Sequence, residues 1–293
     1  MSCVSFCFFV MAKIQVTEDG SHTLFSEMAG QTYHSSYGAI QESRHIFISQ
    51  LSIKSQWSTV NGQRSTVDGQ LARVDGFWDE GLSCGLAMGC EAKLEVLSVL
   101  EIGFGTGLNA VLAAEWAREN GARVDFTTIE LYPLEQEVYG ELNYGRLLGC
   151  EELFLQLHEA EWDAGLQRVN ENFAIRKCKS DIVKWLEFNA QCTTNGLEPW
   201  RKMHNAQSSD LSSKSFNSQY DVVFFDAFSP DAQPELWTEE VFRNVYRLMK
   251  EGGVMTTYCA KGDVRRAMLA AGFRVEKLQG PPGKRHILKA VKE

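Results

Sequence analysis

The stretch EVLSVLEIGFGTG, residues Glu95 to Gly107, decides the fold of this chain. Its apolar run Val96–Ile102 has the composition of a buried β-strand, and a glycine loop follows it directly. The next residues, LNAVLAAEWAREN, place apolar side chains along one face of a helix. Glycines allow the backbone to turn sharply and to approach a ligand closely, and a helix N-terminus favours a carboxylate or phosphate group. The sequence therefore predicts a strand–loop–helix unit that binds a ligand at its loop.

Strands and helices alternate along the rest of the chain. We expect further strands at 122–130, 173–181, 220–228, 254–260, 273–278 and 285–292. We expect further helices at 182–188, 234–250 and 263–271. Alternation predicts a mostly parallel sheet covered on both faces, and the short linker GPPGK predicts that the last two strands are antiparallel. These features predict an α/β protein with the class I S-adenosylmethionine-dependent methyltransferase fold, Rossmann-like, with a mostly parallel seven-stranded sheet and a C-terminal antiparallel hairpin.

The remaining segments define the predicted domain organisation. Residues 1–10 read as a disordered extension, and residues 11–75 read as a small N-terminal extension that packs on the cofactor and substrate site. The methyltransferase domain is expected at 76–293, with a polar insertion rich in Ser, Asn and Gln at about 193–219. No apolar run approaches the roughly 18 residues that a membrane-spanning helix needs, so we expect a cytoplasmic protein without a membrane partner.

Charge and cysteine content limit the possible functions. The net charge of −9 opposes nucleic-acid binding by the surface as a whole, but residues 261–293 carry nine Lys and Arg against three Asp and Glu. This basic end could be an ordinary solvated surface or could meet a local anionic partner. The eight cysteines form no C-x-x-C pair and no cluster with zinc spacing, so we expect free thiols and no metal.

The spacing of the glycine loop favours S-adenosylmethionine over a dinucleotide. The loop reads G-x-G-x-G, whereas a dinucleotide fingerprint reads G-x-G-x-x-G. An acid directly before it, Glu101, suits a cationic amino group better than a pyrophosphate. Glu130 ends the next strand and suits two ribose hydroxyls, or it is a surface or capping residue. Asp181 ends the third strand and could accept from an adenine amine, cap the following helix, or do both. The predicted cofactor residues are Glu101, Gly103, Phe104, Gly105, Thr106, Gly107, Asn109, Glu130 and Asp181.

The stretch FFDAFSPDAQPELW places a carboxylate, Asp226, where the fourth strand ends. Ligands of this type of sheet gather at the carboxyl ends of the strands. Asp226 could orient an attacking amine and balance the positive charge that develops on it, with Phe228 packing on a base and Pro230 stiffening the loop. The alternative is a turn-forming aspartate before Ser-Pro.

Five motifs together give a specific resemblance. YHSSYGAIQESRHIFI, LEIGFGTGLNAVL, FFDAFSPDAQPELWTEEVF, GDVRRAMLAAGFRV and GPPGKRHIL resemble the MnmC-type tRNA methyltransferases in the right order, over roughly residues 32–291. The resemblance implies methyl transfer from S-adenosylmethionine to the 5-aminomethyl group of (2-thio)uridine at the tRNA wobble position, which gives 5-methylaminomethyl-2-thiouridine. Bifunctional members add an FAD oxidase domain. A second glycine fingerprint is not evident in the sequence, so we expect the stand-alone form, acting downstream of the enzyme that installs the aminomethyl group.

The resemblance also assigns residues to the substrate. It places Asp226 beside the amine and the methyl group, as the catalytic residue. The N-terminal motif matches at Tyr33, Ser35, Gly38, Glu42 and Ser43, with Phe228 and Pro230 also near the substrate and His34 taken as structural. The basic residues Arg265, Arg266, Lys284 and Arg285 are expected to contact phosphates of the anticodon stem-loop. Two features depart from the family pattern: Ser180 stands where a glycine is usual, and the 193–219 insertion has no counterpart.

Two other functions remain open from the sequence. A spermidine-synthase-like aminopropyl transferase would share the strand-end aspartate and the acidic ribose position, but the basic C-terminal end argues against a polycationic substrate. A non-catalytic RNA-binding protein with this fold should have a broken glycine loop or lost acids, and neither is broken here.

Overall fold

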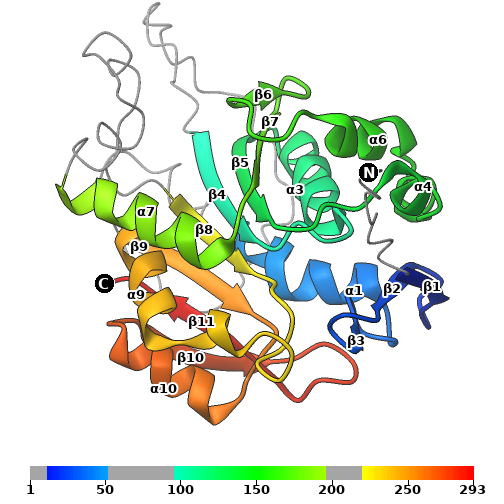
Figure 1. Cartoon of the computed structure of the whole chain (residues 1–293). Coiled ribbons are helices and arrows are strands. Elements are labelled where there is room, and N and C mark those ends of the chain that lie inside the picture. Colours follow the sequence, from blue (N-terminus) through cyan, green and yellow to red (C-terminus); the bar gives the residue numbers. More distant parts are fainter. Residues whose placement is uncertain (1–11, 52–95, 196–219) are drawn as a thin grey trace, which may run out of the picture.

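A computed structural model describes residues 12–51, 96–195 and 220–293 (Figure 1). Its main sheet has eight strands in the order β10-β11-β9-β8-β4-β5-β7-β6. The strands are β4 Val96–Ile102, β5 Arg123–Glu130, β6 Gln167–Arg168, β7 Phe173–Lys179, β8 Tyr220–Phe225, β9 Met249–Thr257, β10 Arg274–Gln279 and β11 His286–Val291.

Strand directions confirm the predicted mostly parallel sheet. Strand β4 lies at its centre, parallel to β5 and β8, and β7 and β9 extend the parallel part. The final hairpin is antiparallel, since β11 pairs with both β10 and β9 in that direction. The predicted number of strands was one too low, because the two-residue strand β6 adds to the edge of β7.

Two layers of helices cover the sheet (Figure 1). One layer holds α3 Leu108–Glu119, α4 Gln136–Tyr139, α5 Tyr144–Leu148 and α6 Glu151–Glu159. The other holds α7 Ile182–Asn195, α9 Glu239–Leu248 and α10 Gly262–Ala270. Side chains of a strand alternate between the faces of its sheet, so neighbouring residues of β8 serve different cores. Phe224 packs in the core under α3, while Phe225 packs in the core under α7 and α9.

Several element boundaries differ from the sequence prediction. The expected helix 234–250 is divided into a 3-10 turn, Pro234–Trp237, and α9, because the Thr238 hydroxyl accepts a hydrogen bond from the backbone of Val241 and starts a new helix. Strand β9 begins at Met249, earlier than predicted, and runs through the glycine pair that follows. Helices α4, α5 and α6 were not predicted.

The N-terminal extension is a small structured unit. Strands β1 Ala12–Val16, β2 His22–Ser26 and β3 Gln31–Thr32 form an antiparallel sheet, followed by α1 Ala39–Ser43 and a π-helical turn, Arg44–Ile48. The backbone N–H of His22 donates to Asn143 Oδ1 at 2.8 Å, and Phe47 packs on Phe224 with ring centroids 5.2 Å apart. Both polar and apolar contacts therefore join the extension to the main domain. The proposed boundary at 75/76, residues 1–10 and nearly all of the 193–219 insertion lie outside the described residues.

Candidate active site

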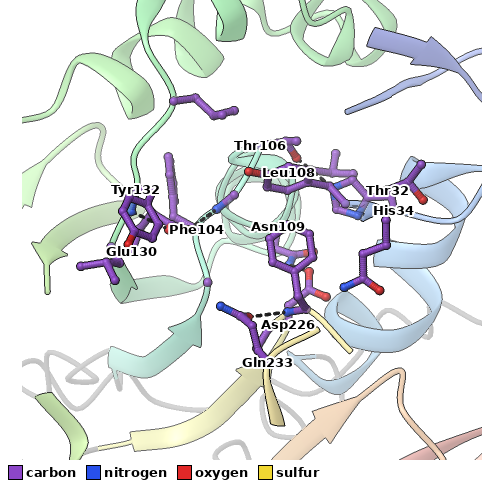
Figure 2. Close-up of a pocket in the computed structure, with 18 of the residues that line it drawn as sticks. Thr32, His34, Phe104, Thr106, Leu108, Asn109, Glu130, Tyr132, Asp226 and Gln233 are labelled. Carbon is purple, nitrogen blue, oxygen red and sulfur yellow. Dashed lines mark hydrogen bonds between the residues drawn. The ribbon is translucent and has the colours of Figure 1, made fainter. Parts of the chain in front are cut away.

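A cavity of about 850 Å³ lies at the carboxyl ends of the central strands (Figure 2). Residues from the glycine loop, the strand ends and the N-terminal extension line it. Of the residues singled out from the sequence, the cavity is lined by Tyr33, Ser35, Glu42, Gly103, Phe104, Gly105, Thr106, Asn109, Glu130, Asp181, Asp226, Phe228 and Lys284. Its lining does not include Glu101, Gly107, Gly38, Ser43, Pro230, Arg265, Arg266 or Arg285.

Two glycines of the loop, Gly105 and Gly107, lie at positions where a side chain would not fit. Gly105 has φ 50°, and a Cβ there would come within 3.0 Å of the Tyr33 ring. Gly107 has φ 72°, and a Cβ there would come within 2.6 Å of His158 Nε2. Both conformations are left-handed, which side chains other than glycine rarely adopt. The loop can therefore pass between Tyr33 and His158 only because it has no side chains at these points.

Glu130 is fixed at the end of β5. Its carboxylate accepts the backbone N–H of Gly105 at 3.1 Å and that of Tyr132 at 2.9 Å. It thus faces the cavity from a defined position, close to the glycine loop (Figure 2). Asp181 also lines the cavity, and its Oδ1 accepts the backbone N–H of Lys184 at 3.0 Å, so it caps helix α7. The structure therefore shows Asp181 in the predicted capping role, and its contact with a ligand stays a prediction.

Asp226 is held by the loop and by its neighbour on α3. Its backbone N–H donates to the carbonyl of Ile102 at 3.1 Å, and Asn109 Nδ2 donates to its Oδ2 at 2.8 Å. Burial raises the pKa of Asp226 to about 7; the Asn109 hydrogen bond and Lys284 oppose this shift, and Glu42 adds to it. Both protonation states of this carboxyl are therefore populated near neutral pH.

Hydrogen bonds hold the conformation of the loop after Asp226. The Phe228 backbone N–H donates to Gln233 Oε1 at 3.1 Å, and Trp237 Nε1 donates to the Phe228 carbonyl at 2.8 Å. The backbone carbonyl of Ser229 accepts the N–H groups of Ala232 and Gln233, so the turn begins at Ser229, next to Pro230. These bonds fix the direction of Phe228, whose ring meets Tyr33 edge-on at 4.8 Å. Gln233 lines the cavity and was not singled out from the sequence.

A charge pair connects the N-terminal extension to the C-terminal hairpin across the cavity. Glu42 accepts the backbone N–H of Ser35 at 2.8 Å with one oxygen and pairs with Lys284 through the other. The ammonium of Lys284 also lies 4.4 Å from the centre of the Tyr258 ring. Lys284 is thus directed into the cavity and toward Glu42. Tyr258, whose hydroxyl donates to the Ala227 carbonyl at 2.9 Å, was missed from the sequence.

Two buried histidines form hydrogen bonds with the glycine loop. His34 Nε2 lies 2.8 Å from the Thr106 hydroxyl, and His158 Nε2 lies 3.2 Å from the Thr106 carbonyl. Burial lowers the pKa of His34 to about 4 and that of His158 to about 3, so both are neutral at pH 7. His158 therefore donates to the carbonyl. The sequence contained no signal for His158, because it lies on the unpredicted helix α6.

Other predicted residues lie outside the cavity lining. Arg266 pairs with Asp263 on the same helix, Arg285 is exposed, and Arg265 is half-buried. Gly38 precedes helix α1 with φ 146°, and Ser43 is buried. Their contacts with a substrate stay predictions. Within the described ranges, there is no cluster of three or more His, Cys, Asp and Glu that could hold a metal, and no helix is long and apolar enough to cross a membrane.

Comparisons with known proteins point to methyltransferases. Residues 203–293 match a family model described as S-adenosyl-L-methionine-dependent methyltransferase. The chain is 26% identical, over 94% of its length, to the tRNA 5-methylaminomethyl-2-thiouridine biosynthesis bifunctional protein MnmC of Aromatoleum aromaticum. The chain resembles MnmC-type proteins. A second MnmC, from Actinobacillus pleuropneumoniae, is 27% identical over 67% of this chain.

The similarity covers only part of those relatives. The chain spans 34% of the first MnmC protein and 27% of the second, so between about a quarter and a third of the length of these curated relatives. The solved structure of MnmC2 from Aquifex aeolicus superposes with a TM-score of 0.64 at 22% identity, covering 96% of this chain and 70% of that chain. The predicted methyltransferase fold is therefore confirmed.

Proposed function

We propose that this chain methylates the amine of a 5-aminomethyl group on a tRNA (2-thio)uridine at the wobble position, with S-adenosylmethionine as the donor. The observation that carries the proposal is the Asp226 carboxylate, which is oriented by Asn109 at the wall of the cavity formed by the glycine loop. A carboxylate in that position suits a nitrogen nucleophile, because it can accept an N–H hydrogen bond and balance developing positive charge.

The residues of the cavity fit S-adenosylmethionine. The glycine loop leads directly into the N-terminus of helix α3, which favours the carboxylate of the donor. Glu130 would accept from the ribose hydroxyls, and Asp181 from the adenine amine. A volume of about 850 Å³ is in the range of small-molecule sites. When bound, this cofactor supplies a methyl group on a positively charged sulfur that leaves as a neutral thioether.

The chain's own contribution is to position the acceptor. Asp226 accepts an N–H of the amine, so that the nitrogen lone pair points at the methyl group and the proton later leaves toward the carboxylate or solvent. Tyr33 and Phe228, in edge-on contact, provide an aromatic surface on which a splayed base can stack. Because the leaving group is neutral, most of the acceleration must come from this positioning.

The tRNA substrate is proposed from the relatives and from the basic end of the chain. The MnmC proteins are named for 5-methylaminomethyl-2-thiouridine biosynthesis in tRNA, and that nucleoside carries the N-methyl group a methyltransferase would add. Arg265, Arg266 and Arg285 are the proposed contacts to phosphates of the anticodon stem-loop. We propose further that the protein acts in the cytoplasm, downstream of the enzyme that installs the aminomethyl group.

The test uses tRNA that carries 5-aminomethyl-2-thiouridine and S-adenosylmethionine with a labelled methyl group. We expect label in 5-methylaminomethyl-2-thiouridine after digestion to nucleosides. The Asp226→Ala variant should lose this transfer while it still binds the cofactor in calorimetry. Putrescine with decarboxylated S-adenosylmethionine serves as the control for aminopropyl transfer. Transfer to another acceptor but not to this tRNA would contradict the proposal, as would aminopropyl transfer to putrescine.

A further inference from the structure

Lys177, in strand β7, is a lysine whose side chain is fully buried. Its exposed fraction is 0%, and it does not line the cavity. Burial lowers the pKa of its ammonium to about 8, and within the described part of the chain no carboxylate contributes to this shift. A buried charge is costly unless it has hydrogen-bond partners, so the neighbours of this ammonium must supply them.

The hydrogen-bond partners of Lys177 are carbonyls at the end of helix α6. Its ammonium donates to the carbonyl of Leu157 at 3.1 Å and to the carbonyl of His158. The N–H of Glu161, which would reach the Leu157 carbonyl if α6 continued, donates to Gln167 Oε1 at 2.9 Å. The last carbonyls of a helix have no partner within the helix, and buried carbonyls need a donor. Lys177 therefore caps the end of α6 from strand β7.

His158, whose carbonyl binds Lys177, also binds the glycine loop. Its Nε2 donates to the Thr106 carbonyl oxygen at 3.2 Å. The imidazole stacks on Tyr139 with ring centroids 4.2 Å apart, and it meets the Phe104 ring edge-on at 5.1 Å. The backbone of His158 is thus fixed by Lys177, and its side chain lies against two residues of the loop.

Lys177 also contacts the glycine loop through an aromatic ring. Its Nζ lies 5.3 Å from the centre of the Phe104 ring and 4.5 Å from that of the Trp162 ring. These two rings meet edge-on at 5.7 Å. A cation within about 6 Å of a ring centre is attracted to the ring face. Phe104 lines the cavity, so one ammonium contacts both a cavity residue and the helix end that binds the loop.

We propose that Lys177 is a positioning residue for the cofactor, which fixes the glycine loop in its binding conformation through His158 and through Phe104. A loop that is already in its bound conformation loses less conformational freedom when the ligand arrives, so the ligand binds more tightly. The inference rests on the proposed cofactor site for this effect on binding. The contacts that join Lys177 to the loop do not depend on it.

The test compares Lys177→Met with Lys292→Met. Lys292 is a matched control, because it is also buried, donates to the carbonyl of Met249 at 2.9 Å and lies 4.8 Å from the centre of the Tyr246 ring. None of these three control residues lines the cavity. Methionine has a similar length but no donor, so both variants should unfold at lower urea concentration than wild type.

Calorimetry with S-adenosylmethionine separates positioning from a general loss of stability. Under conditions where the urea curves show folded protein, Kd should rise at least about tenfold in Lys177→Met and stay within about twofold of wild type in Lys292→Met. Lys177→Arg keeps a cation and donors for both carbonyls, so its Kd should lie within about threefold of wild type. If Lys177→Met does not fold, Lys177→Gln, which keeps an amide donor, replaces it with an expected rise of at least about threefold.

Two results of the calorimetry would overturn the proposal. One is a Kd in Lys177→Met, or in the Gln variant that replaces it, that equals the wild-type value or rises no more than in Lys292→Met. The other is a loss in Lys177→Arg as large as that in the variant without the cation.

The link between Lys177 and the loop can also be measured without a cofactor. In the free protein the proton on His158 Nε2 should exchange slowly with solvent, because it is buried and donates to Thr106. With ¹⁵N-labelled histidine, its exchange rate should rise at least about tenfold in Lys177→Met and stay within about twofold in Lys292→Met. Equal rates in all three proteins would overturn the role of Lys177, whereas a wild-type protein that binds no S-adenosylmethionine would contradict the proposed function.

Discussion

Replacing Asp226 by Asn should make the protein more stable at high pH. The pKa of this carboxyl rises from 3.8 to about 7 on folding, chiefly because of burial. Each pKa unit corresponds to about 1.4 kcal/mol, so a shift of about three units costs about 4 kcal/mol when the group is fully ionised. This value is an upper limit, because Asp226 is only partly excluded from solvent. Asn keeps the shape of the side chain and has no charge to bury.

The sign of the effect follows from which state binds the proton more tightly. Below pH 4 the carboxyl is protonated in both the folded and unfolded protein, so its burial has little cost. Between pH 4 and 7 the unfolded chain has released the proton while the folded protein retains it, so stability decreases as pH rises. Above pH 7 the full cost is present. The advantage of Asp226→Asn over wild type should thus be about 2–3 kcal/mol larger at pH 8 than at pH 5.

Urea unfolding of wild type and Asp226→Asn at pH 5 and pH 8 measures this difference. Asp221→Asn is the matched control, because Asp221 lies at the other end of β8 and has favourable partners. Its carboxylate pairs with Lys250 at 2.7 Å and accepts the Ser98 backbone N–H at 3.0 Å, so this variant should be less stable at both pH values. An advantage of Asp226→Asn that is equal at pH 5 and pH 8 would refute the reasoning from burial.

Two further predictions concern the loop and the charge pair. Gly107 and Gly149 both have a left-handed φ, so replacing either by Ala should lower the free energy of unfolding by about 1 kcal/mol. Only at Gly107 does the new Cβ come within 2.6 Å of His158, so Gly107→Ala should lose roughly a further 1–3 kcal/mol and should also bind the cofactor more weakly in calorimetry. Equal losses of stability in the two variants would contradict the contact with His158. Lys284→Met leaves Glu42 buried without its cation and should lower the free energy of unfolding by about 2–3 kcal/mol. The double variant with Lys284→Met and Glu42→Gln should recover most of that stability. Additive effects of the two substitutions in a double-mutant cycle would show that the pair is not coupled.

The sheet could be predicted because its signals are local. Val96–Ile102 is a continuous apolar run followed by glycines, and the chain around GPPGK is a short linker between two strand patterns. Such patterns are present within a window of about ten residues. Helices α4 and α5, of four and five residues, are too short to show the period of a helix, so the sequence did not indicate them.

The cavity was harder to predict because its contacts join distant parts of the chain. The charge pattern of the sequence assigned Lys284 to a basic surface. A count of charges carries no information about burial, so it could not show that Lys284 lines the cavity. Its partner Glu42 is 242 positions away, and the pair forms only when the N-terminal extension meets the final hairpin. For the same reason, Thr106 could be assigned to the glycine loop from sequence, but the two histidines that bind it could not.

The position of Glu101 before the glycine loop shows how a motif can mark a residue without placing it at the surface of the cavity. The motif suggests a carboxylate ready for a cation, yet the strand register turns the side chain toward Thr128, whose hydroxyl donates to it, and Glu101 does not line the cavity. Asp226 does line the cavity, so of these two carboxylates it is the one that a positively charged donor would meet. Burial raises the pKa of Asp226, and the arrival of the cation would offset part of that shift, because an opposite charge favours the ionised form. Stability is lowered at the residue on which the proposed chemistry depends, as expected for a preorganised site.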